Sequence, residues 1–225
     1  MQRTTASPHR QDVLRRFVLL GTPLTLGILE LGHPLLDFMN PIKMLSPIAV
    51  WWIILHMLQI PLFGLMGWAL YLLIQDVHSR AATISRCATG VYIVFAIGYD
   101  AAVGLSISIL VRNASTLPNT QQGIIQQAIQ QLLSNPAIVL TNLIVLGAGA
   151  VSICSAAWAL SHAGAPRLPL FILLGALLAT YSHATPFGPL GNACFFLAAL
   201  WIELVWCRFP SREKNALAIS DVPQT

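Results

Sequence analysis

Residues 48–74 read IAVWWIILHMLQIPLFGLMGWALYLLI and contain no Lys, Arg, Asp or Glu. A helix needs about 20 mainly apolar residues to cross the hydrocarbon core of a bilayer, so this stretch is long enough to do so. In lipid, every backbone N–H and C=O group must find its partner within the protein, which favours a helix over a lone strand. This stretch therefore predicts a membrane protein.

The overall composition agrees with that prediction. The chain has 225 residues, of which 56% are hydrophobic and only 9% are charged, whereas a soluble domain carries about 25% charged residues. The net charge is +4, but the basic residues are scattered between apolar blocks. They form no basic patch of the kind that binds nucleic acid, so no nucleic-acid partner is expected.

Five further apolar blocks accompany residues 48–74, and the sequence predicts an all-α bundle of six transmembrane helices. The predicted spans are about 17–39, 48–74, 87–111, 137–160, 168–185 and 190–207. Together they form one transmembrane domain, 17–208, between a basic segment at 1–16 and a tail at 209–225. The last two spans are expected to form a hairpin around a turn at 186–189, which contains two prolines and a glycine.

The basic residues predict the orientation of this bundle. Six spans with the N-terminus inside put ten Lys and Arg on the cytoplasmic side: Arg3, Arg10, Arg15, Arg16, Arg80, Arg86, Arg167, Arg208, Arg212 and Lys214. Only Lys43 and Arg112 fall outside. Because Lys and Arg are enriched in cytoplasmic loops, both termini are predicted to be cytoplasmic, in a plasma-membrane protein. Trp51 and Trp52, at the start of the second span, are predicted to be interfacial anchors.

The segment 117–136 differs from the spans. It contains six glutamines, and apolar pairs recur between them every four residues. That period places the apolar side chains on one face of a helix. The segment is predicted to be an amphipathic helix on the outer side, which either lies flat on the leaflet or packs over the bundle as a lid.

Polar side chains inside the spans are few, and ionisable groups at such positions usually have a function. Glu30, His33 and Asp37 are spaced to share one face of the first helix, which Pro34 is expected to bend. The other spans contribute His56, Gln59, Tyr99, Asp100, Tyr181, His183 and Asn192. With a rise of about 1.5 Å per residue, Glu30, His33, His56 and Asp100 lie roughly 9–16 Å from the outer surface. The predicted site therefore lies in the outer half of the bilayer.

These side chains favour a metal site. Neutral imidazole and carboxylate groups suit zinc or iron, so His33, His56 and His183 are the predicted metal ligands. Glu30 and Asp100 are the predicted catalytic carboxylates, able to act as a general base or to orient a histidine. Asp37, Gln59, Tyr99, Tyr181 and Asn192 are the predicted substrate-binding residues.

Other interpretations of the same residues stay open. Asp100 can simply pair with His56 in a structural polar network, and His56 and His183 can hold a haem between helices. Three functions follow: a metal-dependent enzyme acting on a lipid or apolar small molecule, a proton- or cation-coupled transporter or binding protein for a small polar solute, and a structural membrane partner. Polar groups on one side only favour the enzyme over the transporter. The oligomeric state is not determined by the sequence.

Overall fold

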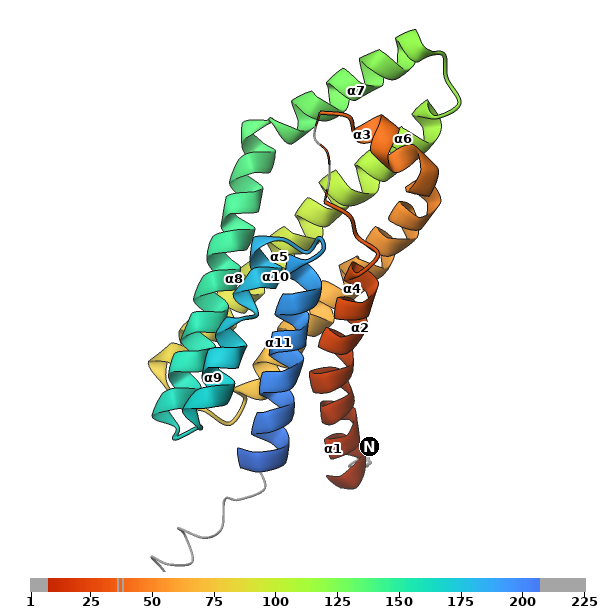
Figure 1. Cartoon of the computed structure of the whole chain (residues 1–225). Helices are drawn as coiled ribbons and strands as arrows, with labels where there is room; N and C mark the ends of the chain where they lie inside the picture. The colour runs from red at the N-terminus through yellow and green to blue at the C-terminus, as the bar shows by residue number, and fades with distance from the viewer. Residues whose placement is uncertain (1–7, 36, 38, 207–225) are drawn as a thin grey trace, which may run out of the picture.

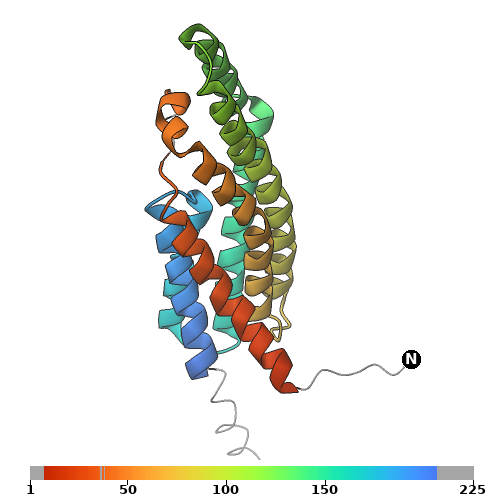
Figure 2. The same ribbon diagram turned by 90° about the vertical axis from the view of Figure 1, so that its right-hand side faces the viewer.

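The computed structural model describes residues 8–35, 37 and 39–206 of the chain. Within these residues the secondary structure is helical and contains no strand, which confirms the all-α prediction. The long helices stand side by side in an elongated bundle (Figures 1 and 2). This arrangement positions the candidate site between helices that are far apart in the sequence.

The helices follow one another in short groups that are continuous or nearly continuous along the chain. The first group is α1 (Pro8–Arg16), η1 (Phe17–Gly21) and α2 (Thr22–Glu30), and the second is α3 (Pro41–Leu45), η2 (Ser46–Ile48) and α4 (Ala49–Leu73). The third is α5 (Arg80–Tyr99), η3 (Asp100–Leu105) and α6 (Ser106–Ala114), followed by α7 (Asn119–Leu133) and α8 (Pro136–His162). The last groups are α9 (Arg167–Leu174) with α10 (Leu177–Tyr181), and α11 (Phe187–Trp201) with η4 (Ile202–Trp206).

Four of these helical segments are long and apolar enough to cross a membrane. They are Pro41–Leu73, Arg80–Ala114, Pro136–His162 and Phe187–Val205, and they correspond to the predicted spans 48–74, 87–111, 137–160 and 190–207. The mean hydropathy of their most apolar windows lies between 1.5 and 2.2. The protein is therefore a multi-pass helical protein of the kind that contacts a lipid bilayer. The other two predicted spans correspond to Pro8–Glu30, which is more charged, and to the shorter Arg167–Tyr181.

The first helix ends earlier than the sequence predicts. It stops at Glu30, and the described residues from 33 to 40 are not helical. The prediction that Glu30, His33 and Asp37 share a helical face, bent at Pro34, was therefore wrong. Proline lacks a backbone N–H and disfavours the helical conformation of the residue before it, here His33, so Pro34 ends the helix instead of bending it.

The predicted fifth span is also interrupted. Helix α9 ends at Leu174, a turn at 175–176 follows, and α10 ends at Tyr181, so His183 lies in a loop and not in a helix. The turn before α11 covers 182–186, because residues 187–189 already belong to the helix. Proline is well tolerated in the first turn of a helix, where its missing N–H would have no partner. The predicted turn at 186–189 was therefore placed too late.

The predicted amphipathic helix is present as α7. It lies at one end of the bundle, next to α3 and α6 (Figure 1). Its Ile129 is fully buried, and the side-chain amides of Gln126 and Gln130 donate to the Met39 carbonyl at 2.9 and 3.0 Å. Helix α7 thus packs on the end of the bundle, and none of its residues lines the cavity described below.

Polar contacts tie the other end of the bundle together. Arg15 of α1 forms an ion pair with the buried Glu203 of η4 at 2.5 Å. The Arg86 guanidinium donates to the carbonyls of Ile74, Gln75 and Val77 at 2.8–3.1 Å. Orphan carbonyls after a helix end, here that of α4, are thereby satisfied. These contacts join the first helical group to the last, and the second to the third.

Candidate metal centre

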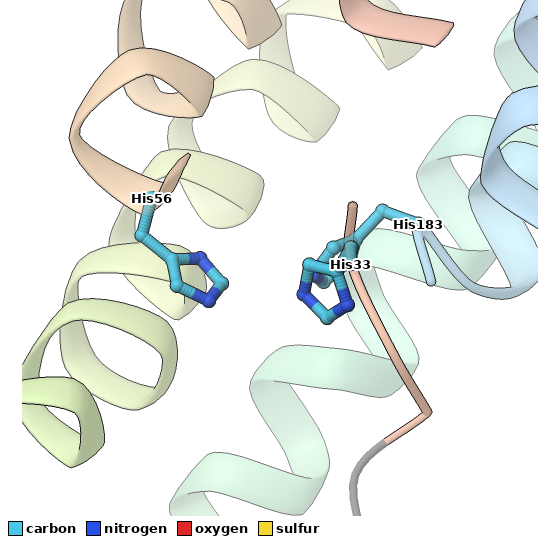
Figure 3. A group of neighbouring side chains, drawn as sticks. All are labelled: His33, His56 and His183. Carbon is cyan, nitrogen blue, oxygen red and sulfur yellow. The ribbon is translucent and has the colours of Figure 1, made fainter. Parts of the chain in front are cut away.

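Three histidines converge in the interior of the bundle. His33 lies in the loop after α2, His56 lies on α4 and His183 lies in the loop after α10. One ligand atom from each lies within 4.8 Å of the others, and Figure 3 shows the His56 side chain directed toward His33 and His183, which overlap in this view. The ring centroids are 4.5 Å apart for His33 and His183, and 5.3 Å apart for His33 and His56.

His56 is oriented by a buried carboxylate. Its Nδ1 lies 2.7 Å from Oδ1 of Asp100, and the two side chains are each only 2% exposed. Because a carboxylate accepts, Nδ1 donates its proton and Nε2 keeps a free lone pair. That Nε2 is buried and has no hydrogen-bond partner among the described residues. A carboxylate behind an imidazole is the usual arrangement around a histidine that binds a metal.

His33 is oriented in the same way by a backbone carbonyl. Its Nδ1 lies 2.9 Å from the carbonyl oxygen of Pro34, which can only accept. The lone pair of His33 is therefore on Nε2, which is likewise buried and unpaired within the described structure. The Trp52 ring packs against both histidines, with centroids 4.5 Å from His33 and 5.2 Å from His56.

The loop that carries His183 is attached to the end of α2. The backbone N–H of Thr185 donates to the His33 carbonyl at 2.9 Å, and the Thr185 hydroxyl donates to the Glu30 carbonyl at 2.8 Å. The Glu30 carbonyl, at the end of α2, also accepts from the His33 backbone N–H at 3.0 Å, and the His33 carbonyl lies in the loop that follows. Thr185 thereby holds the two loops that present His33 and His183 against each other.

This group can hold a metal ion. Zinc binds imidazole nitrogen at about 2.0–2.1 Å, so three nitrogen atoms within 4.8 Å of one another can reach one ion after small side-chain rotations. Iron accepts the same donors. The haem alternative is disfavoured, because the His33 ring packs against both His56 and His183 where a macrocycle between them would lie.

A cavity of about 530 Å³ opens beside the histidines. All three histidines line it, together with Tyr99 and Asp100. Much of the remaining wall is apolar and is formed by η3, α6 and α8. Small-molecule sites usually measure about 300–1,000 Å³ and are mostly apolar with a few polar groups. The size and lining of this cavity fit that description.

The other predicted site residues fall in different places. Tyr99 and Tyr181 line the cavity. Glu30 accepts a hydrogen bond from the Asn192 amide at 2.7 Å, and both residues line a second pocket of about 50 Å³. Gln59 is fully buried but lines neither pocket.

Asp37 lies on the surface, outside both pockets. Its carboxylate accepts hydrogen bonds from the Asn40 amide and from the Met39 backbone N–H at 3.1 and 2.9 Å. These contacts, with the Asn40 amide first, lower the pKa of Asp37. The carboxylate is engaged in a surface turn, and its predicted role in substrate binding has no geometric support.

Several residues of the cavity were missed as site residues, among them Trp52 and Asn142. Trp52 was predicted to be an interfacial anchor, but it is only 3% exposed and packs on the histidines. Trp51 is the more exposed of the pair, and its indole N–H donates to the Gly32 carbonyl at 3.0 Å. Asn142 lines the cavity from α8. The signal for Asn142 was present, since an amide inside an apolar span usually faces other protein groups.

No protein-family model, curated protein or solved structure matches this chain. The chemistry of the site is therefore inferred from its side chains. Three imidazoles occupy at most three coordination positions of a metal ion. Catalytic zinc sites have three protein ligands and leave the fourth position to water or substrate. This arrangement is thus suited to catalysis as well as to metal storage.

Proposed function

We propose that the protein is a membrane-embedded, metal-dependent enzyme that binds zinc or iron through His33, His56 and His183 and acts on a lipid or apolar small molecule. One observation carries the proposal. Two buried imidazoles, those of His33 and His56, each donate Nδ1–H to a protein oxygen and keep a buried Nε2 that has no partner in the described structure, and both residues belong to the group of three histidines. Leaving such atoms buried and unpaired is costly unless something binds them.

The side chains around the histidines have separate roles in this proposal. A bound metal ion supplies Lewis acidity and activates water near neutral pH. Asp100 is a positioning residue, because its carboxylate accepts the His56 proton and holds the ring in one tautomer. Glu30 is the candidate proton acceptor. Its pocket and the large cavity share the lining residues Tyr92 and Thr180.

We further propose six spans, with both termini cytoplasmic and the site in the outer half of the plasma membrane. The ten basic residues expected inside, against two outside, support this orientation. The order of the helical groups supports the span number. Pro8–Glu30 and the interrupted Arg167–Tyr181 lie alongside the four long helices in Figures 1 and 2.

The orientation predicts which positions a reagent can reach from outside the cell. In a chain whose native cysteines are replaced by serine, Gln121→Cys on α7 is expected to react with a membrane-impermeant maleimide on intact cells. His78→Cys, between α4 and α5, is expected to react only after permeabilisation. Both native side chains are exposed. Labelling of His78→Cys on intact cells would contradict the proposed orientation.

The metal proposal predicts the content of the purified protein. Protein extracted in detergent without chelator is expected to contain about one equivalent of zinc or iron, as a catalytic site with three protein ligands would. Inductively coupled plasma mass spectrometry measures the metal, and an optical spectrum tests for haem. Protein that is folded and contains neither zinc nor iron, even after incubation with each metal, would refute the proposal. A Soret band in the optical spectrum would show bound haem, and the protein would then be a haem protein and not a zinc or iron enzyme of the proposed kind.

A proton- or cation-coupled transporter is the second candidate. The observation in its favour is the small pocket of Glu30 and Asn192, which also contains the hydrogen-bonded pair Thr89 and Ser152. Ser85, one turn from Thr89, donates to the Ser152 carbonyl at 2.8 Å, so buried polar groups continue away from the histidines. Metal-free protein that moves protons across proteoliposomes would favour this candidate over the enzyme.

A further inference from the structure

The apolar part of the large cavity restricts what can bind there. Beyond the histidines, the wall contains Ala96, Val103, Ile107, Val145 and Leu146. These side chains come from four neighbouring elements, α5, η3, α6 and α8. Burial of apolar ligand surface against such a wall contributes roughly 25 cal/mol per Å². The wall therefore favours a hydrocarbon chain.

Charge restricts the ligand further. Among the residues that the structure describes, the cavity lining contains no Lys or Arg, and its one carboxylate, Asp100, already accepts from His56. Phosphate groups are recognised mainly by Arg and Lys, so the α8 side of the cavity offers a phosphate group no cationic partner. A phosphate group would therefore meet no Lys or Arg in the described lining and could pair only at the three histidines.

One polar side chain in the α8 wall has no partner. Asn142 lines the cavity and forms no hydrogen bond within the described structure. Its amide offers two donor hydrogens and one acceptor oxygen. A polar group at membrane depth without a partner is unfavourable, so a ligand that supplies the partner gains affinity. Asn142 thus fits an uncharged group such as a hydroxyl, an ester or an amide.

We propose that the cavity binds a neutral, single-chain amphiphile, with its chain along the α8 wall, and that Asn142 recognises its uncharged polar group. This inference rests on the proposed function and names its substrate class. In this arrangement the polar group lies between Asn142 and the three histidines, and the chain lies against Val145 and Leu146. The apolar wall selects the chain, and the absence of Lys and Arg from the described lining disfavours a phosphate group beside Asn142.

Two pairs of variants test the inference on α8. Val145→Trp places a bulky ring in the cavity, whereas Val151→Trp places the same ring on an outward position that is 46% exposed. Asn142→Leu removes the amide, and Leu143→Ala changes a neighbour that is 57% exposed. Each protein is reconstituted in nanodiscs, and binding of radiolabelled 1-oleoylglycerol is measured with 1-oleoyl-lysophosphatidylcholine as competitor. The metal content of each preparation is measured in parallel.

Saturable binding is expected in the wild type, Val151→Trp and Leu143→Ala. Val145→Trp is expected to weaken binding about five- to 150-fold, since overpacking of a filled site costs about 1–3 kcal/mol. Asn142→Leu is expected to weaken it about three- to tenfold, as one hydrogen bond is worth about 0.5–1.5 kcal/mol. The lysophospholipid is expected not to compete.

Two outcomes would overturn the inference: equal binding by Val145→Trp and Val151→Trp, or competition by the lysophospholipid as strong as by unlabelled 1-oleoylglycerol. If metal is present in those preparations, the proposed enzyme still stands. Conversely, the expected binding pattern in a protein that takes up no metal would support the ligand class and refute the enzyme. The two proposals therefore fail separately.

Discussion

The double variant His56→Ala, His183→Ala will lose almost all bound metal. Only His33 would remain of the three histidines that offer ligand atoms within 4.8 Å of one another. Binding to a metal site depends on several ligands acting together, so a lone imidazole is expected to retain less than about one tenth of the wild-type metal after dialysis. Mass spectrometry of the dialysed protein measures this loss directly.

The chain offers a matched control for this experiment. His78 and His162 are exposed and lie outside both pockets, and His162 stacks on the exposed Trp158 with ring centroids 5.5 Å apart. The double variant His78→Ala, His162→Ala should keep the wild-type metal content. Equal loss from both double variants would assign the metal to scattered histidines, and retention by the site variant would refute the three-histidine centre.

The variant Gly104→Ala will disturb the centre by pressing on the His56 ring. A Cβ at position 104 would overlap the His56 ring, and the ring atom nearest to it is Nδ1, which forms the 2.7 Å hydrogen bond to Asp100, so a shift of the ring disturbs that bond. Overpacking of this kind costs about 1–3 kcal/mol of stability. Loss of a group that orients a ligand weakens metal binding about 10–100-fold. Thermal unfolding in detergent and metal titration measure the two effects.

Gly98→Ala is the control for Gly104→Ala. It lies in the same continuous helical segment, two turns before Gly104, and a Cβ there would meet nothing within 4 Å. Replacing an unconstrained helical glycine by alanine stabilises a helix by about 0.5–1 kcal/mol. Unchanged metal affinity is expected. Metal affinity in Gly104→Ala equal to that in Gly98→Ala would show that His56 does not need its present position.

The long helices and the pairing of His56 with Asp100 could both be predicted from the sequence. A continuous apolar run specifies a helix through its length alone, and α4, α5–α6 and α8 are such runs. His56 and Asp100 were predicted as possible partners because their depths agree. The structure confirms that His56 and Asp100 are hydrogen-bonded. Because this hydrogen bond uses only Nδ1 of His56, it leaves Nε2 available to a metal ion.

The local geometry of the site was less predictable. Helix ends depend on local chain chemistry, so the stop before Pro34 and the break at 175–176 escaped an analysis based on apolar length. The rotation of each helix about its axis depends on its neighbours. Asn142 and Asn192 are both amides in apolar helices, yet one lines the large cavity and the other binds Glu30. Depth along a span does not distinguish these two environments.

The attachment of Thr185 to the end of α2 has a consequence for biosynthesis. It joins a segment made early by the ribosome to one made near the end, and His33 and His183 lie on either side of that junction. A nascent chain that has completed α8 contains only two of the three histidines. The proposed metal centre is therefore complete only after His183 has been synthesised, and a metal bound by all three histidines would then favour the fully assembled chain by mass action.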